Sequence, residues 1–247
     1  GDYGIFALTA GSYTLTYSKS GFQGTTQSAT LASDTDNITV ATLTMCPSGS
    51  SGGNISGQIK DAVSGDNVSG ALVSLRSGLN ERQSSTISGK TATTANNGTY
   101  TISSVDAGSY TAEASKSGFI TSYFNVSSCT GASNQDTNMR ETLPDGAMSI
   151  VLTWRGTEDF DSHLEIPVSD DQDGASNSTD STHLFYGTQS SGLDYHSYGT
   201  GDNVTLDQDN YVGIVSTCPI SKPGAGTISK CGPETITISK VRSGTYR

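Results

Sequence analysis

The chain has 247 residues, of which 32% are hydrophobic, and its 24 acidic against 13 basic residues give a formal net charge of −11. This length and composition suit two or three small cores better than one large core. A chain that repels phosphate gains nothing from counterion release, so nucleic acids and anionic membrane surfaces are poor partners. No apolar run in the sequence reaches the length of a membrane-spanning helix.

A segment near the start of the chain occurs a second time. Ala10 to Phe22 reads AGSYTLTYSKSGF and Ala107 to Phe119 reads AGSYTAEASKSGF, so ten of thirteen residues match at an offset of 97. A period of this size fits one small β-sandwich per repeat. The sequence therefore predicts a tandem array.

Short stretches with period-two alternation recur between turn residues. Thr, Val, Ile and Tyr dominate these stretches, and Asn-Gly, Ser-Gly-Asp and Lys-Ser-Gly separate them, which is typical of strands and tight turns. No window has the apolar spacing of an amphipathic helix. We therefore predict an all-β fold of tandem β-sandwich modules, immunoglobulin-like or transthyretin-like, with essentially no helix. The predicted strands are Tyr13–Tyr17, Ile38–Thr44, Ile55–Ile59, Ala71–Leu75, Thr99–Ile102 and Tyr110–Ala114.

Two changes of composition divide the chain into modules. Residues 47–53, PSGSSGG, are typical of a flexible joint, and residues 143–146, LPDG, indicate a tighter one. We expect residues 1–46 to be the C-terminal half of a sandwich, residues 47–145 to be a complete sandwich, and residues 146–247 to be a third, truncated one.

The second module contains an ordered set of motifs. GNISGQIKDAVSGDNVSGALVSL at residues 53–75 is followed by TATTANNGTYTISSVDAGSYTAEASKSGF at residues 91–119. This order resembles the carboxypeptidase regulatory-like family of transthyretin-type sandwiches. The resemblance covers the whole module and about half of the first, and it implies a non-catalytic domain; the chain also has no HExxH motif for a peptidase zinc. The buried positions that it implies are Ile55, Ile59, Leu72, Val73, Leu75, Tyr100, Ile102, Val105, Tyr110 and Phe119.

The third module has a different texture. Residues 147–167, AMSIVLTWRGTEDFDSHLEIP, contain the only Trp of the chain, and SIVLTW predicts a buried strand. The motifs THLFY, VTLDQD and CGPETITI follow in that order. This succession is similar to the poorly characterised YfaP-like domain family, although residues 212–230 insert an additional loop before the last motif.

Five carboxylates of the third module are candidate metal ligands. If the segment DFDSH is extended, its two aspartates lie on one face, and the LDQD segment repeats this arrangement. Converging carboxylates repel one another unless a hard cation neutralises them, and calcium prefers six to eight oxygen ligands. We therefore predict a calcium site formed by Asp159, Asp161, Asp207 and Asp209, with Glu234 as a fifth ligand or an acceptor behind the ligands. The alternative is that these carboxylates are solvated.

The sequence also contains two other candidate metal-binding sites. Residues 169–180, SDDQDGASNSTD, resemble an EF-hand loop, but they begin with Ser and no helices flank them. His163, His183 and His196 could bind a transition metal or serve only as hydrogen-bonding groups. No enzyme is predicted, because neighbouring aspartates on one strand do not straddle a sugar ring and the GSSGG at residues 49–53 lacks the strand and helix of a nucleophile elbow.

Four cysteines allow three pairings. Cys218 and Cys231 bracket a short loop and are most simply paired with each other, which leaves Cys46 for Cys129. The second bridge would stiffen the joint between the first two modules and contribute about 4 kcal/mol under the chain-entropy model. No CxxC motif supports zinc or redox chemistry instead.

Seven Asn-x-Ser/Thr sequons are spread over all modules, and together with the cysteines they favour an extracellular or cell-surface protein that carries N-linked glycans. They begin at Asn37, Asn54, Asn67, Asn97, Asn125, Asn177 and Asn203.

The sequence as a whole predicts an extracellular glycosylated structural protein, a tandem β-sandwich subunit of a cell-surface fibre, hair or stalk. Its expected partners are copies of itself or neighbouring subunits, because an incomplete sandwich with an exposed edge could accept strands from the next subunit. The alternative is a calcium-dependent adhesin, or a module that binds a carbohydrate or protein ligand at the surface.

Overall fold

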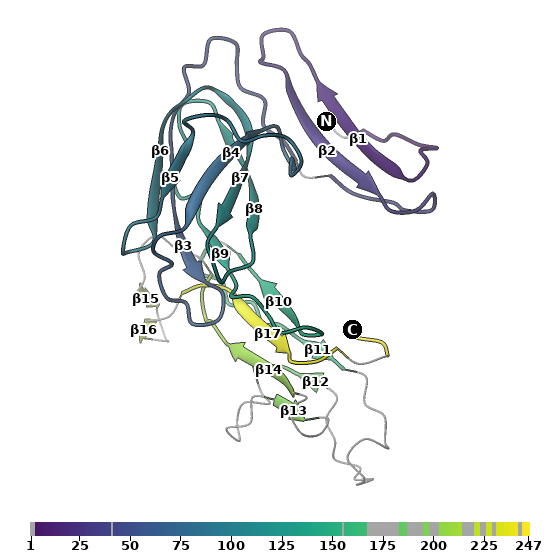
Figure 1. The fold of residues 1–247 in the computed structure, drawn as a ribbon, viewed down its shortest axis with the longest axis vertical. Helices are drawn as coiled ribbons and strands as arrows, with labels where there is room; N and C mark the ends of the chain where they lie inside the picture. The colour runs from purple at the N-terminus through teal and green to yellow at the C-terminus, as the bar shows by residue number, and fades with distance from the viewer. Residues whose placement is uncertain are drawn as a thin grey trace. The chain divides into compact units, whose positions relative to one another are not determined.

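The computed structural model of the chain contains strands joined by turns and loops, with no α-helix among the residues that it describes (Figure 1). The predicted all-β class is therefore confirmed. Accordingly, the described part of the chain offers no helix of the length and hydropathy that a membrane span requires. The structure describes residues 3–40, 42–154, 156–166, 183–186, 195–197, 203–213, 220–222, 226–228, 231–241 and 244–247.

The chain divides into two compact units. The first comprises Gly1–Ile59, Val68–Ser117 and Thr121–Thr137, and the second comprises Lys60–Asn67, Gly118–Ile120 and Asn138–Arg247. The loop around Ala62 belongs to the second unit. The Ala62 N–H donates to the Met139 carbonyl at 2.9 Å, and the Ala62 carbonyl accepts a hydrogen bond from the Thr235 hydroxyl. The module boundaries expected after residues 46 and 145 stay predictions.

The chain up to Met139 contains nine strands in the described residues. They are β1 (Gly11–Tyr17), β2 (Thr25–Leu31), β3 (Gly53–Asp61), β4 (Leu72–Ser77), β5 (Thr91–Thr93), β6 (Thr99–Val105), β7 (Gly108–Ser115), β8 (Ser122–Ser128) and β9 (Thr137–Met139). The longest connections lie between β2 and β3 and between β4 and β5. The strands predicted at Tyr13–Tyr17, Ile55–Ile59, Thr99–Ile102 and Tyr110–Ala114 lie within β1, β3, β6 and β7, and the one at Ala71–Leu75 begins one residue before β4.

The middle part of the chain has the two sheets of a sandwich. One has the order β6-β3-β9 and the other the order β5-β4-β7-β8. Period-two alternation turns Val73 and Leu75 of β4 inward, where both are fully buried. Leu72 is 44% exposed, so its predicted burial is wrong, because its neighbour Val73 takes the inward face. Phe119 is half-buried, and the other predicted core positions are buried.

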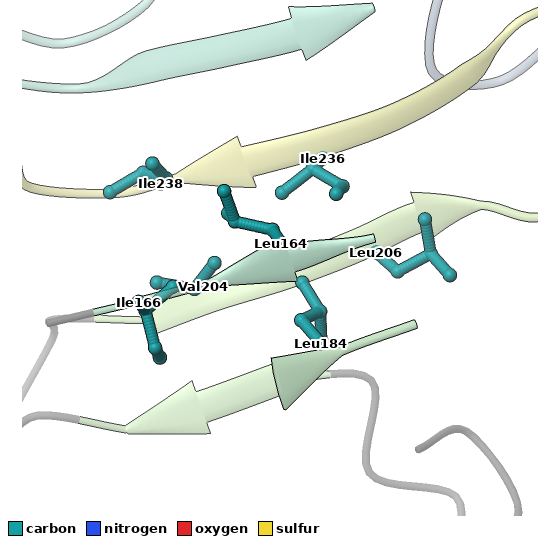
Figure 2. Close-up of a cluster of buried hydrophobic side chains, with 7 residues drawn as sticks. All are labelled: Leu164, Ile166, Leu184, Val204, Leu206, Ile236 and Ile238. Atoms are coloured by element: carbon teal, nitrogen blue, oxygen red, sulfur yellow. The ribbon is translucent and has the colours of Figure 1, made fainter. Parts of the chain in front are cut away.

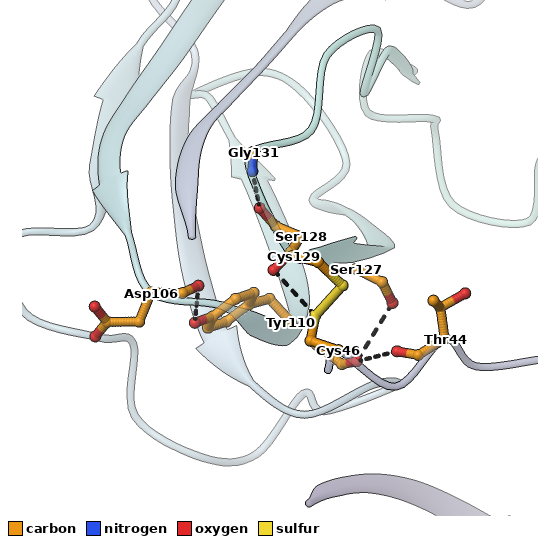
Figure 3. Close-up of a disulfide and its surroundings, with 9 residues drawn as sticks. Thr44, Cys46, Asp106, Tyr110, Ser127, Ser128, Cys129 and Gly131 are labelled. Carbon is orange, nitrogen blue, oxygen red and sulfur yellow. Dashed lines mark hydrogen bonds between the residues drawn. A yellow bond between two sulfur atoms is a disulfide. The ribbon is translucent and has the colours of Figure 1, made fainter. Parts of the chain in front are cut away.

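The hairpin β1-β2 repeats the strand register of the hairpin β7-β8, and the repeated sequence covers its first strand and most of its turn. It is antiparallel, with Gly11 opposite Leu31 and Tyr17 opposite Thr25. The Tyr13 hydroxyl donates to the carbonyl of the residue four positions earlier at 2.7 Å, and the Tyr110 hydroxyl does the same to Asp106 at 2.8 Å (Figure 3). These shared local bonds show that the repeat includes its corner as well as its strands.

The backbone before each hairpin also repeats. Ala7 has φ of 58° and Ser104, 97 positions later, has φ of 55°, and both values are uncommon for residues other than glycine. The strand predicted at Ile38–Thr44 is absent from its described residues, so that prediction is wrong. The residues 97 positions later include β9, which pairs with β3. No counterpart of β3 accompanies Ile38–Thr44 in the described residues, and a strand needs such a partner.

A disulfide joins the segment after the first hairpin to the end of β8. Cys46 and Cys129 are bonded, with their Cα atoms 5.1 Å apart (Figure 3), and this is the pairing that we expected. Backbone bonds flank it on both sides, because Gln23 N–H donates to the Cys46 carbonyl at 2.8 Å and Gly52 N–H donates to the Cys129 carbonyl at 3.1 Å. The bridge is thus built into the first unit.

Strand β2, the second strand of the first hairpin, also contacts the loop after β4. Ser28 N–H donates to the Leu79 carbonyl at 2.9 Å, and Leu79 N–H donates to the Thr26 carbonyl at 3.0 Å. A Cβ atom on Gly78 would lie 2.7 Å from the Thr26 hydroxyl oxygen. Glycine at this position therefore permits the close approach of the two segments.

The second unit contains one larger sheet and two hairpin-like pairs. The sheet has the order β10-β17-β14-β13, and β11 pairs with β12 and β15 with β16. The strands are β10 (Met148–Leu152), β11 (Leu164–Glu165), β12 (His183–Leu184), β13 (Tyr195–Ser197), β14 (Asn203–Gln208), β15 (Ile220–Lys222), β16 (Gly226–Ile228) and β17 (Glu234–Ile238).

The core of the second unit is a compact group of aliphatic side chains (Figure 2). They come from β11, β12, β14 and β17 and the residues beside them, and Tyr246 packs against the group. The predicted strand at residues 149–154 exists as β10, but its predicted burial is wrong, because β10 is an edge strand and Ile150 and Val151 are each 37% exposed. The core consists of Leu164, Ile166, Leu184, Val204, Leu206, Ile236 and Ile238.

Candidate metal centre

Three loops at one end of the β14-β17 pair carry the candidate ligands. Gly213 N–H donates to the Gly156 carbonyl at 3.2 Å, and the Asn210 side-chain amide donates to the Pro233 carbonyl at 2.6 Å. A Cβ atom on Gly213 would lie 2.4 Å from the Trp154 carbonyl oxygen. The loops are therefore tied together by a backbone bond and by the Asn210 side-chain amide, without any contribution from the carboxylates.

Glu234 is the innermost acid of this group. It is the first residue of β17 and its exposed fraction is 0%. Its Oε2 atom accepts a hydrogen bond from the Ser162 N–H, which holds the DFDSH segment against the strand. Its Oε1 atom is also buried, yet no N–H or hydroxyl group of the described residues donates to it. A buried carboxylate oxygen without a donor is costly and is rare in folded proteins.

Two further carboxylates face Glu234. One ligand oxygen each from Asp161, Asp209 and Glu234 lies within 4.8 Å of the other two. Burial raises the pKa of Glu234 to about 7, against the opposing effect of the Ser162 hydrogen bond, and the charge of Asp209 raises it further. Burial likewise raises the pKa of Asp209, and the charges of Asp161 and Asp159 add to the effect. Both shifts favour the uptake of protons or of a cation by this group.

The chemistry of this group suits a hard divalent cation. Carboxylate oxygens are the ligands that calcium prefers, and an exposed Asp161 opposite a buried Glu234 leaves one side of the group accessible. The arrangement can hold an ion and join three loops through it.

The structure brings together three of the five predicted ligands. Asp159 is exposed and acts on Asp209 through its charge. Asp207 accepts a hydrogen bond from the Thr237 hydroxyl and is not part of the three-carboxylate group. A bulge between Leu206 and Gln208 interrupts the pairing of β14 with β17, so the alternation that would put both aspartates of LDQD on one face does not hold.

Sequence reasoning missed the residues that position the acids. Ser162 contributes its N–H and its hydroxyl to Glu234. Asn210, whose exposed fraction is 2%, contributes its side-chain amide. An Asn directly after the LDQD motif was a usable signal, because a buried side-chain amide commonly holds a neighbouring backbone. The backbone bond from Ser162 carried no signal, since every residue except proline has an N–H.

The remaining predicted sites are partly described. Asn37, Asn54, Asn67 and Asn97 are exposed. Asn125 is half-buried: its Oδ1 accepts from the Asn80 N–H at 2.8 Å, and its Nδ2 donates to the Asn80 side chain at 2.7 Å. Glycosylation stays a prediction at all seven sequons. Asn177, the side chain of Asn203, and the EF-hand-like residues 169–180 lie outside the described residues.

Cys231, expected to pair with Cys218, is disulfide-bonded. Cys218 itself lies outside the described residues, so the predicted partner stays a prediction. The YfaP-like resemblance of the third module likewise stays a prediction.

None of the curated proteins compared with this chain matches it. Among solved structures, the chain is similar to the major pilin SpaD of Corynebacterium diphtheriae, at 16% identity over 78% of this chain and 53% of that chain, with a TM-score of 0.30. A cohesin-X-dockerin complex of Acetivibrio cellulolyticus gives 24% identity over 38% of this chain and 65% of that chain, with a TM-score of 0.27. The chain thus covers less than two thirds of either structure.

One family model also matches, and it does so where the sequence motifs placed the resemblance. The model describes the Carboxypeptidase regulatory-like domain, and its match covers residues 54–144 of this chain.

Proposed function

We propose that this chain is a structural subunit of a cell-surface fibre, hair or stalk, built from serial β-sandwich modules and assembled through copies of itself or neighbouring subunits. Its role is mechanical: closed sandwiches, a disulfide and short connections hold a fixed spacing. The alternative is an adhesin or a module that binds a carbohydrate or protein ligand at the surface.

One observation carries this proposal: the first hairpin has the structure of β7-β8 without its neighbours. β7 has β8 on one side and β4 on the other. β1 has only β2 beside it in the sheets of the described residues. A strand with an unpaired edge is a template for another chain, and strand addition is a common route to polymers.

Apolar side chains near the hairpin agree with a missing neighbour. Phe6 is 86% exposed, and Tyr3 and Ile5, in the same stretch of chain before β1, are exposed as well. A group of exposed large apolar side chains on a soluble protein usually marks an interaction site. An incoming strand would cover backbone groups along β1 and apolar surface beside it.

The test is assembly of the full chain with and without charges on this edge. Thr14 and Thr16 of β1 are exposed, and the double variant T14K/T16K puts two positive charges on the strand, which discourages edge pairing. We expect wild-type chain to form oligomers that grow with concentration in analytical ultracentrifugation, and the variant to stay monomeric.

A matched control places the same charges elsewhere. Thr121 and Thr130 are exposed and lie outside the strands, so T121K/T130K should assemble like the wild type. A monomeric wild type at high concentration would count against assembly.

Electron micrographs of native material then separate the two functions: regular polymers support the fibre, and dispersed particles support the adhesin.

An extracellular location with N-linked glycans completes the proposal. The Cys46–Cys129 disulfide supports it, because such bonds persist in oxidising compartments. The exposed positions of Asn37, Asn54, Asn67 and Asn97 leave room for glycans. Peptide mass spectrometry of the native protein tests this directly, and unmodified asparagine at every sequon would refute the glycan assignment.

A second proposal concerns the metal centre, and the unsatisfied buried oxygen of Glu234 favours it. We infer that a calcium ion bound by Asp161, Asp209 and Glu234 neutralises these carboxylates and occupies the place of the missing donor at Oε1. The ion would join the three loops at the end of the β14-β17 pair. Its contribution is to stability of the second unit, with no catalytic step.

Calorimetric titration with calcium and melting with and without chelator test this proposal. D161N and E234Q should each weaken calcium binding by about tenfold or more, since even groups behind the ligands cost that much. D207N is the matched control, because Asp207 bonds Thr237 instead, and it should bind like the wild type. A wild type that takes up no calcium, or whose melting ignores the chelator, would refute the site.

A further inference from the structure

Two histidines meet on the outer face of the pair β11-β12. Leu164 and Leu184 are opposite each other in this pair and point into the core. Because side chains alternate along a strand, His163, directly before Leu164, and His183, directly before Leu184, point away from the core. The Nδ1 atom of His163 lies 2.9 Å from the Nε2 atom of His183, at an exposed position.

An aromatic side chain holds both rings. The Phe185 ring stacks on His163, with centroids 5.5 Å apart and planes 12° apart. It also stacks on His183, with centroids 4.7 Å apart and planes 20° apart. Stacking of this kind restricts the rotation of both imidazoles. The two nitrogens are therefore held close together by packing as well as by their hydrogen bond.

We propose that His163 and His183 form a binding site for one zinc-class transition-metal ion. Zinc binds imidazole nitrogen at about 2.0–2.1 Å in tetrahedral geometry, which separates two such nitrogens by about 3.3 Å. The observed 2.9 Å differs from this by a few tenths of an ångström. A small rotation of each ring turns the nitrogens from each other toward a common ion.

The two rings are the ligands that the chain supplies in this proposal. In the hydrogen bond one facing nitrogen carries the proton and donates, and the other nitrogen accepts the hydrogen bond. Coordination uses the unprotonated nitrogen of each ring, so the ring that donated changes tautomer and its proton moves to the outward nitrogen. Solvent reaches the exposed pair and fills the remaining positions on the ion. The formal charge of −11 also attracts cations to the chain.

This site is chemically distinct from the carboxylate group. Imidazole favours zinc, copper and nickel, whereas carboxylate oxygens favour calcium and magnesium. Excess calcium should therefore saturate the group of Asp161, Asp209 and Glu234 and leave the histidine pair available. The two proposals can fail independently of each other.

The experiment is calorimetric titration of zinc chloride into the full chain in excess calcium. We expect one zinc ion per chain. H163N and H183Q keep an amide near each coordinating nitrogen, so they preserve hydrogen bonding without offering an imidazole, and each should weaken zinc binding by about tenfold or more. H196N, which alters the remaining histidine of the sequence, should bind like the wild type.

Melting curves without metal check that these variants fold, and zinc should raise the melting temperature of the wild type and of H196N only. A wild type without measurable zinc uptake would overturn the proposal. Zinc binding that survives both H163N and H183Q would also overturn it, because the ion would then lie elsewhere.

Discussion

The two copies of the repeated hairpin share their local structure and differ in burial. Tyr110, Ala112 and Ala114 of β7 are buried, with exposed fractions of 7%, 0% and 0%. The residues at the same places in β1 are Tyr13, Leu15 and Tyr17, and all three are only half-buried. At two of these three positions, Leu15 and Tyr17, the larger side chain occurs in the copy with less covering structure.

This difference separates what a segment determines by itself from what its neighbours supply. The corner hydrogen bond and the positive φ before the hairpin occur in both copies, so they depend on the local sequence. Complete burial occurs only in β7, which has strands on both sides and a second sheet in its module. A core is a property of the whole sandwich, and β1 needs added strands to acquire one.

Loss of the disulfide should have the largest effect on stability. It should act on the sandwich formed by β3 to β9, which we call the middle module. Cys46 and Cys129 are 83 positions apart and enclose β3 to β8, whereas β1 and β2 lie outside the closed loop. C46A/C129A should lower the free energy of unfolding of the middle module by about 4 kcal/mol. Hydrogen exchange measures both regions together, and a variant whose hairpin amides lose more protection than those of β4 and β7 would contradict this.

Exchanging side chains between the two copies of the hairpin should have the second-largest effect on the free energy of unfolding. Ala112 has no exposed surface and is opposite Leu75, so A112L overfills the core and should cost about 1–3 kcal/mol. L15A removes a half-buried side chain and should cost about 1 kcal/mol or less. Urea unfolding followed by probes in each strand gives both values, and an equal cost in the two copies would mean that β1 is already part of a closed core.

Removal of the tyrosine hydroxyl that bonds the chain before each hairpin should have a smaller effect on stability. The loss should again be larger for β7 than for β1. Tyr110→Phe leaves the Asp106 carbonyl without its partner beside the buried Tyr110 ring, at a partly buried place, so we expect a loss of about 1 kcal/mol. Tyr13→Phe should cost only a few tenths of that, about 0.3 kcal/mol, because water can replace the hydroxyl at the exposed Thr9 carbonyl. Thermal unfolding of the two single variants and the wild type is sufficient, and a larger loss for the first hairpin would refute the comparison.

The fold was predictable where alternation and turn residues act locally. The strands β1, β3, β6 and β7 and the inward positions Val73 and Leu75 follow from period two and from the family motifs. Ile38–Thr44 has the same alternation and forms no strand in its described residues. The described residues contain no partner strand for this segment. The alternation of side chains within one segment cannot predict whether a partner strand is present.

The candidate metal centre was predictable in residue type and only partly in geometry. Asp161, Asp209 and Glu234 converge, although the first of them is not in a strand and the bulge in β14 sends Asp207 to Thr237. A bulge adds one residue to one strand, and it leaves no mark in a motif as short as LDQD. The burial of Glu234 depends on three loops that meet only after folding.

The smallest expected effect is a pH dependence at the contact between the hairpin and the loop after β4. The backbone N–H groups of Ser84 and Gln83 hold the pKa of Glu81 below its usual 4.5, and the Ser28 hydroxyl of β2 adds to this at 3.1 Å. A carboxyl whose pKa is lower in the folded protein stabilises it above pH 4.5, and this stability is lost as the pH falls through the lower folded value. Exchange of β2 amides should therefore quicken in that acid range in the wild type, and E81Q should flatten the dependence. If E81Q and the wild type respond alike to acid, the contact does not depend on this charge.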